Sequence, residues 1–130
     1  MAYWLFKQEP SAYNFSDLEE EKETVWDGVS NNLALKHLRN VKRGDKVFFY
    51  HSGEEKRIVG IMEVASAGSG RDGAPVVNVK PLARLDRPVP LDIIKSDKSF
   101  SSWELVRISR LSVMPVPSEL WAKILKLSKV

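Results

Sequence analysis

The alternation of hydrophobic and polar positions predicts that this chain is organised around short β-strands. Apolar, aromatic and β-branched residues form compact runs bounded by Gly, Pro, Asp or Ser, which is the pattern of buried strands. The runs cover residues 3–7, 46–52, 57–65, 76–85 and 111–114. In the run 46–52 both alternating faces are largely apolar, as expected for a closed barrel or for a sheet that is covered on both sides.

Short helices are predicted between and after these strands. An apolar stripe indicates one helix over residues 31–39, and residues 91–95 allow one further helical turn. Ser16 and Glu19 have the spacing of a capping box, and Ser118 precedes a final amphipathic stripe. Helices interspersed with an antiparallel meander indicate a mainly β, α+β fold, in which a small β-barrel is flanked by short helices.

Composition limits the classes of protein to consider. The length of 130 residues suits one domain, so we expect residues 1–130 to form a single domain. Cysteine is absent, which excludes disulfides, thiolate metal sites and cysteine nucleophiles. No apolar run approaches the ~20 residues of a membrane span, and the first apolar stretch is shorter than the core of a signal peptide. We therefore expect a soluble, cytoplasmic monomer with no membrane partner.

The charge balance permits an anionic partner without requiring one. Lys and Arg number 20 against 17 Asp and Glu, which gives a net charge of +3 and a pI near 9.2. A pI above about 9 is a first indication of nucleic-acid binding, and it needs support from particular residues.

Motifs for catalysis are weak in this sequence. No Walker motif and no G-x-S-x-G elbow occurs. Gly68, Gly70 and Gly73 match G-x-G-x-x-G, but a strand follows them where a phosphate-binding loop needs a helix, so a hairpin loop is the better interpretation. His51 and Ser52 are neighbours in a predicted strand, so their side chains point to opposite faces. Residue spacing therefore gives no positive support to an enzyme.

Trp26 and Asp27 form the first candidate binding unit, in a turn that leads to Asn31 at a predicted helix start. An indole supplies a stacking surface for a base, worth about 1–3 kcal/mol, while Asn and Asp can read the polar edge of that base. The alternative is that Trp26 anchors the core and Asn31 caps the helix.

The end of the predicted strand 46–52 is the second candidate. Tyr50, His51 and Ser52 place three polar tips in succession, as at the mouth of a barrel where ligands bind. The alternative is a barrel corner in which each polar tip forms a local hydrogen bond.

Taken together and in order, these residues resemble the EVE domain family, a branch of the PUA-like superfamily that is related to the YTH readers of methylated adenine. The matching segments are Tyr3-Trp4-Leu5, Lys7, Glu9-Pro10, Trp26-Asp27-Gly28-Val29, Asn31, Ala34, Gly44-Asp45, Phe49-Tyr50-His51-Ser52, Gly60-Ile61, Glu63-Val64, Arg110-Leu111-Ser112-Val113 and Pro115-Val116. They extend over nearly the whole chain.

The resemblance implies a PUA-like β-barrel with a pocket for a modified, in particular methylated, base of DNA or RNA. Trp26 would stack on this base, and flipping the base out of a duplex would cost a few kcal/mol. The residues that would line or support the pocket are Lys7, Trp26, Asp27, Asn31, Tyr50, His51 and Ser52. The resemblance implies a non-catalytic module with no metal and no organic cofactor.

Basic residues outside the pocket are candidates for contacts with the nucleic-acid backbone, which position the partner without reading its sequence. They are Lys42, Arg43, Lys56, Arg57 and Arg110. One departure from the family concerns Ser30, which stands where members usually carry Arg. Because an Arg supplies a rigid fork of donors, the ligand or the affinity can differ from that of typical members.

Two other functions stay open at this point. An enzyme acting on a modified nucleotide would use His51 and Glu9 as acid and base. The third possibility is a protein-interaction module with a vestigial pocket. Ser30 and the short loop at residues 68–73 leave this possibility open.

Overall fold

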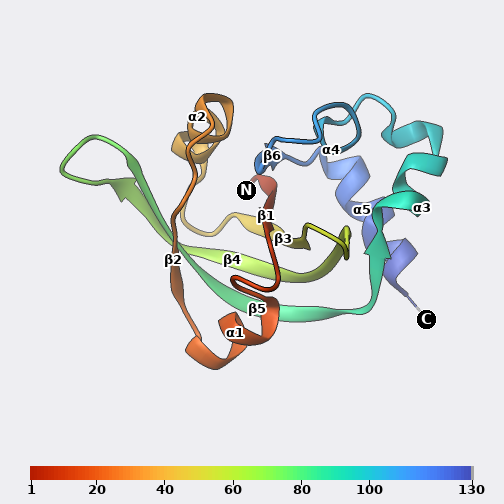
Figure 1. Cartoon of the computed structure of the whole chain (residues 1–130), viewed down its shortest axis with the longest axis horizontal. Helices are drawn as coiled ribbons and strands as arrows, with labels where there is room; N and C mark the ends of the chain where they lie inside the picture. The colour runs from red at the N-terminus through yellow and green to blue at the C-terminus, as the bar shows by residue number, and fades with distance from the viewer. Residues whose placement is uncertain (130) are drawn as a thin grey trace.

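A mixed sheet of six strands, curled into a half-barrel, forms the centre of the computed structural model, which describes residues 1–129 (Figure 1). The strands lie in the order β2-β5-β4-β3-β1-β6. Their bounds are β1 Tyr3–Gln8, β2 Thr24–Trp26, β3 Lys46–His51, β4 Arg57–Ser69, β5 Pro75–Pro90 and β6 Val113–Pro115. β1 and β3 pair in parallel, whereas the other neighbouring strands pair antiparallel. The expected α+β, PUA-like architecture is confirmed, with β2 and β6 as the two edges of the half-barrel.

Short helices surround the sheet at three places. They are α1 Phe15–Glu21, α2 Asn32–Asn40, α3 Leu91–Ser96, the 3-10 helix η1 Lys98–Phe100, α4 Glu104–Arg107 and α5 Ser118–Ser128. Figure 1 shows α2 at the top, α1 at the bottom, and α3, α4 and α5 gathered at the right. No helix among residues 1–129 is long and apolar enough to cross a membrane.

Strand β3 is buried on both faces, as its aromatic pattern predicts. Phe48 stacks on Trp121 of α5 with ring centroids 3.8 Å apart, and Phe49 meets Phe15 of α1 edge-on at 5.5 Å. Both β3 rings are fully buried. Alternation along one strand therefore places α5 against one face of β3 and α1 against the other.

Helix α1 begins two residues earlier than the sequence predicts. Asn14 is its N-cap, and its side chain accepts from the N–H of Asp17, whose carboxylate accepts from the N–H of Asn14. The capping box expected at Ser16 is therefore wrong, and the Ser16 hydroxyl accepts a hydrogen bond from Arg84 instead. The earlier start makes Phe15 the first helical residue and brings its ring against Gly60, where any larger residue would collide with it.

The buried carboxylate of Asp45 ties three parts of the fold together. It accepts from the indole N–H of Trp4 at 2.9 Å, and from the backbone N–H groups of Lys42 at 2.9 Å and Ala2 at 3.1 Å. The contacts join β1, the start of the chain and the turn before β3. Three donors satisfy a carboxylate that is only 4% exposed, so its burial is tolerated.

Replacing Asp45 by Ala should lower the free energy of unfolding by about 3 kcal/mol, because three buried donors lose a charged acceptor. Denaturant titration of the purified variant measures this loss. Asp86→Ala is the matched control, since Asp86 is exposed on β5 and should change stability by less than about 0.5 kcal/mol. Equal stabilities of the two variants would contradict the proposed importance of Asp45.

Candidate nucleic-acid interface

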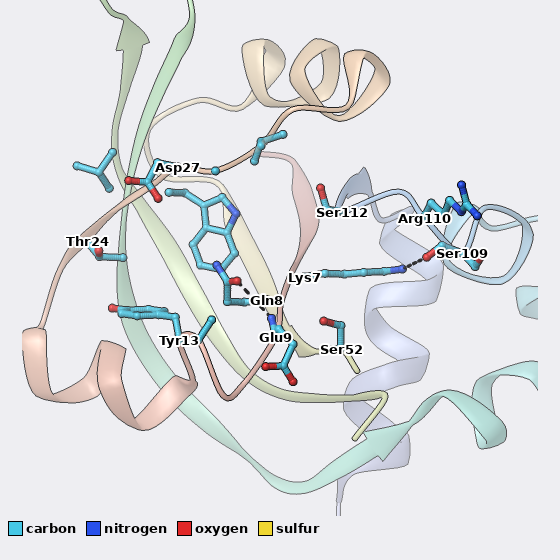
Figure 2. Close-up of a pocket in the computed structure, with 15 residues that line it drawn as sticks. Lys7, Gln8, Glu9, Tyr13, Thr24, Asp27, Ser52, Ser109, Arg110 and Ser112 are labelled. Atoms are coloured by element: carbon cyan, nitrogen blue, oxygen red, sulfur yellow. Dashed lines mark hydrogen bonds between the residues drawn. The ribbon is translucent and has the colours of Figure 1, made fainter. Parts of the chain in front are cut away.

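A cavity of about 680 Å³ opens where β1 ends, and we call it the β1–β2 cavity (Figure 2). Ser52, which follows β3, and Ser112, which precedes β6, lie on either side of the end of β1. The N–H of Lys7 donates to the carbonyl of Ser112, and the N–H of Ser52 donates to the carbonyl of Gln8, both at 2.9 Å. Backbone hydrogen bonds therefore hold this side of the cavity in place.

The opposite side of the cavity comes from the segment between β1 and α2. Residues 24–29, which include β2 and the turn after it, form most of this side, together with Glu9, Ala12 and Tyr13. Strand β2 is held by antiparallel pairing with β5, in which Trp26 lies opposite Val77. The cavity is thus bounded by two strands that are far apart in the order of the sheet.

Trp26 is both a core residue and part of the cavity wall. Its ring packs 5.2 Å from Phe6 and 5.4 Å from Phe49, the latter in a perpendicular arrangement. Only 4% of the surface of this residue is exposed, which is too little for an open ring face. The structure thus supports the interpretation of Trp26 as a core anchor and also places it at the cavity, while stacking on a base stays a prediction.

Lys7 brings a positive charge into the cavity. Its ammonium donates to the carbonyl of Ser109 at 3.0 Å and lies 5.4 Å from the centre of the Tyr50 ring. Burial lowers the pKa of Lys7 below its usual value. Figure 2 shows its side chain pointing toward Ser109 and Arg110, so two cationic residues share this side of the cavity.

Tyr13 is a wall residue that sequence reasoning missed. Its hydroxyl donates to Glu21 at 2.5 Å. Burial, and next the hydrogen bond to Glu21, raise the pKa of Tyr13 to about 12. The phenol therefore presents a neutral, half-buried aromatic ring to the cavity.

Five polar wall residues were also missed as ligand contacts. They are Gln8, Glu9, Thr24, Ser109 and Ser112, of which Glu9 was considered only as a catalytic group. Thr24 had a usable signal, because strand alternation puts it on the same face as Trp26. Ser112 belongs to a segment that matches the family, but Ser109 had no signal, since its position depends on how a distant loop packs against β1.

Of the seven predicted ligand residues, the structure brings together Lys7, Trp26, Asp27 and Ser52, whereas Asn31, Tyr50 and His51 do not line the cavity. The side chain of Asn31 accepts from the N–H of Ala34 at 3.0 Å and caps α2, as the alternative interpretation expects. Tyr50 is buried beneath Lys7.

His51 lies instead at a second cavity, of about 810 Å³. Its Nε2 accepts from the N–H of Phe15 at 3.1 Å, and its Nδ1 lies 2.9 Å from Glu55 Oε1. Since Nε2 accepts, the proton of the neutral ring is on Nδ1 and is donated to Glu55. That hydrogen bond, and next one from Arg57, lower the pKa of Glu55. Both ring nitrogens are thus used in holding α1 and the turn after β3.

Among the predicted backbone contacts, Arg110 is the one at the β1–β2 cavity. Lys42 and Arg43 are exposed in the turn before β3, and Lys56 is exposed in the turn after it. Arg57 lines the second cavity and pairs with Glu55. Contacts of these four residues with a phosphate backbone stay predictions. Within residues 1–129, no group of three potential ligands could hold a metal ion.

Raising the pH from 10 through about 12 should lower the free energy of unfolding, because two buried phenols ionise late. Burial raises the pKa of Tyr50 to about 12, with a smaller effect from Asp92, and Tyr13 behaves similarly. Both folded-state pKa values exceed the usual 10.0, so their contribution is complete below pH 10 and is lost as the pH rises through about 12. Phenolate absorbance measures the two pKa values, and denaturation midpoints at each pH measure the loss of stability. Tyr13→Phe should remove one late titration step, and ionisation of both phenols near pH 10 would contradict the assignment.

Comparison with known proteins supports the relationship that the sequence suggests. The family model of the EVE domain matches residues 2–127. Rat thymocyte nuclear protein 1 is 28% identical over 166 residues, which cover 98% of this chain and 74% of the rat protein. A protein of Rhodopseudomonas palustris, solved by NMR, superposes with a TM-score of 0.92 at 36% identity, covering 98% of this chain and 93% of its own.

A third relative was solved with a ligand. It is the human THYN1 protein in complex with DNA that contains 5-methylcytosine, and it superposes with a TM-score of 0.90 at 27% identity. The alignment covers 100% of this chain and 99% of the human one. The family match extends over nearly every described residue, from the first strand to the last helix, and this chain therefore belongs to the EVE domain family.

Proposed function

We propose that this chain is a non-catalytic module that binds nucleic acid and holds one modified base, flipped out of its stack, in the β1–β2 cavity. The convergence of Lys7, Trp26, Asp27 and Ser52 on one cavity carries the proposal, because these side chains come from segments that are separate in the sequence. The structural likeness to the human THYN1 protein bound to DNA with 5-methylcytosine supports a methylated base as the ligand.

The chemistry of the walls suits a single base. Aromatic side chains, Trp26 and Tyr13, supply apolar contacts, while Lys7, Asp27 and Ser52 supply polar groups. Arg110 lies at the same cavity, where it would contact the phosphate of the bound nucleotide. Extrusion of the base costs a few kcal/mol, so a single-stranded or mismatched site should bind more tightly than a fully paired one.

The arrangement favours binding over catalysis. Both ring nitrogens of His51, the residue that an enzyme would use as its acid or base, are engaged with Phe15 and Glu55. Glu9 accepts from the N–H and the hydroxyl of Ser11. We therefore expect the bound base to leave the cavity unchanged.

Lys7→Gln should weaken binding of a single-stranded oligonucleotide with one 5-methylcytosine by roughly tenfold, because a charge-assisted contact is lost. Fluorescence anisotropy measures the affinity for this oligonucleotide, for its unmodified form and for the matching RNA. Lys95→Gln on the exposed surface of α3 is the control, which should bind like the wild type. Catalytic turnover of the modified base, or no binding of any oligonucleotide by the wild type, would contradict the proposal.

Salt should separate phosphate contacts from base contacts. Arg110→Ala should reduce the slope of log affinity against log salt by about 1, equally for modified and unmodified oligonucleotides, because a phosphate contact releases a counterion whatever the base. The same titration applied to Lys42, Arg43, Lys56 and Arg57 tests each as a backbone contact. An unchanged slope in Arg110→Ala would remove Arg110 from the interface.

A further inference from the structure

The segment between β2 and β3 carries only basic charges. Residues 28–44 contain no Asp or Glu, and they hold Lys36, Arg39, Lys42 and Arg43. All four are exposed, and none of their side chains forms a hydrogen bond or an ion pair with any of residues 1–129. The next carboxylate, Asp45, is buried and already accepts from three donors. Four unpaired positive charges therefore face solvent over one short stretch.

The helix geometry places two of these charges on one face. Ala34 and Leu38 are the buried residues of α2, so they mark the side that faces the core. With about 100° of rotation per residue, Lys36 and Arg39 lie about 60° apart around the helix, on the side opposite the core. Residues 42 and 43 follow in the turn that leads to β3. We call residues 36, 39, 42 and 43 the α2 basic face.

Helix α2 follows directly on a wall of the β1–β2 cavity. Val29 belongs to that wall, and α2 begins three residues later at Asn32. The nine residues of α2 extend for about 13 Å at about 1.5 Å per residue. One strand of a B-form duplex advances about 3.4 Å per nucleotide, so α2 is as long as about four nucleotides.

The helix on the other side of β2 has the opposite charge. Residues 17–23, in α1 and just after it, carry five carboxylates and one lysine. Glu20 is exposed and has no hydrogen bond or ion pair with any of residues 1–129. Figure 1 shows α1 and α2 at opposite ends of β2, the strand that forms part of the cavity wall. A polyanion at the cavity therefore meets attraction on the α2 side and repulsion on the α1 side.

We propose that the nucleic-acid strand whose base enters the cavity leaves it on one side only, with its phosphates along the α2 basic face and away from α1. This inference rests on the proposed function and adds the path of the strand. A base in the cavity holds its own backbone at the rim, so the neighbouring phosphates must pass one of the flanking helices. The α2 basic face offers them unpaired cations, whereas α1 offers carboxylates.

The turn after β3 suits a phosphate backbone less well. Arg57 is paired with Glu55 and lines the second cavity, which is also lined by Glu9 and Glu54. Carboxylates surround this arginine and offset its charge. We therefore expect Lys42 and Arg43, and not Arg57, to contribute to the salt dependence of binding.

The test uses the position of the modified base within the oligonucleotide. Three single-stranded DNA oligonucleotides of equal length and composition carry 5-methylcytosine near the 5′ end, in the middle or near the 3′ end. Fluorescence anisotropy at low salt measures their affinities, and the unmodified oligonucleotide gives the non-specific background. The wild type should bind the middle form and one end-placed form alike. It should bind the other end-placed form roughly tenfold more weakly, because that form has no phosphates over α2.

The double variant Lys36→Gln/Arg39→Gln tests whether α2 causes this difference. It should weaken the tighter end-placed form to the affinity of the weaker one and reduce the salt slope by about 1.4. Both side chains are exposed and Gln is a good helix former, so the fold should survive, which circular dichroism checks. Lys95→Gln/Lys126→Gln is the charge-matched control on α3 and α5, and it should keep the difference between the two end-placed forms.

A charge reversal on α1 tests the repulsive side. Glu20→Lys replaces an exposed, unpaired carboxylate by a cation. It should strengthen binding of the weaker end-placed form and leave the tighter form nearly unchanged, so the difference between the two forms should shrink.

The outcomes separate this inference from the proposed function. Modification-dependent binding with equal affinity for the two end-placed forms would overturn the one-sided path and leave the proposed function standing. An equal effect of the double variant and its charge-matched control on both forms would do the same. Absence of binding to every oligonucleotide by the wild type would overturn the proposed function and this inference with it.

Discussion

The parallel pairing of β1 with β3 is the constraint on which the rest of this structure depends. Parallel neighbours need a crossover, so the chain must travel from the end of β1 back to the start of β3 before it can pair. The crossover, residues 9–45, carries α1, β2 and α2. It also delivers Tyr13 and Trp26 to the end of β1. One pairing choice thus determines both the centre of the sheet and the far wall of the cavity.

Rigid surroundings hold the polar groups of the cavity where they are. Trp26 is wedged between Phe6 and Phe49, so the position of its N–H follows from the core and not from a flexible loop. Lys7 lies within β1, and its ammonium donates a hydrogen bond to the carbonyl of Ser109. His51 contributes indirectly, because its hydrogen bond to Phe15 anchors the start of α1 behind the same wall. Pre-organisation of this kind lowers the entropic cost of binding any ligand in the cavity.

Strand alternation separates the side chains of His51 and Ser52, and the structure places them at different cavities. Alternation places His51 and Ser52 on opposite faces of the strand, and the resemblance implies that both line or support one pocket, which stays a prediction. Ser52 lines the β1–β2 cavity, and His51 faces the second one. Asn31 was equally ambiguous, since an amide before a helix can cap it or read a base, and capping satisfies it locally. The start of α1 was missed for a similar reason. Residues 14–17 and 16–19 both have the spacing of a capping box, and the box at Asn14 and Asp17 is the one that forms. Choosing between them requires knowing that Phe15 is buried in the core.

The sequence by itself determined the local elements and several cavity residues. Hydrophobic periodicity and helix caps act over a few residues, so β1, β3 and α2 could be read directly, and the Trp26-Asp27 pair stood out by its chemistry. Only the tertiary structure decided which polar groups share a cavity. Lys7 and Ser109 meet although 102 positions separate them. Their contact depends on sheet curvature and on the packing of the loop before β6, which are collective results of burying one core and leave no local pattern in the chain.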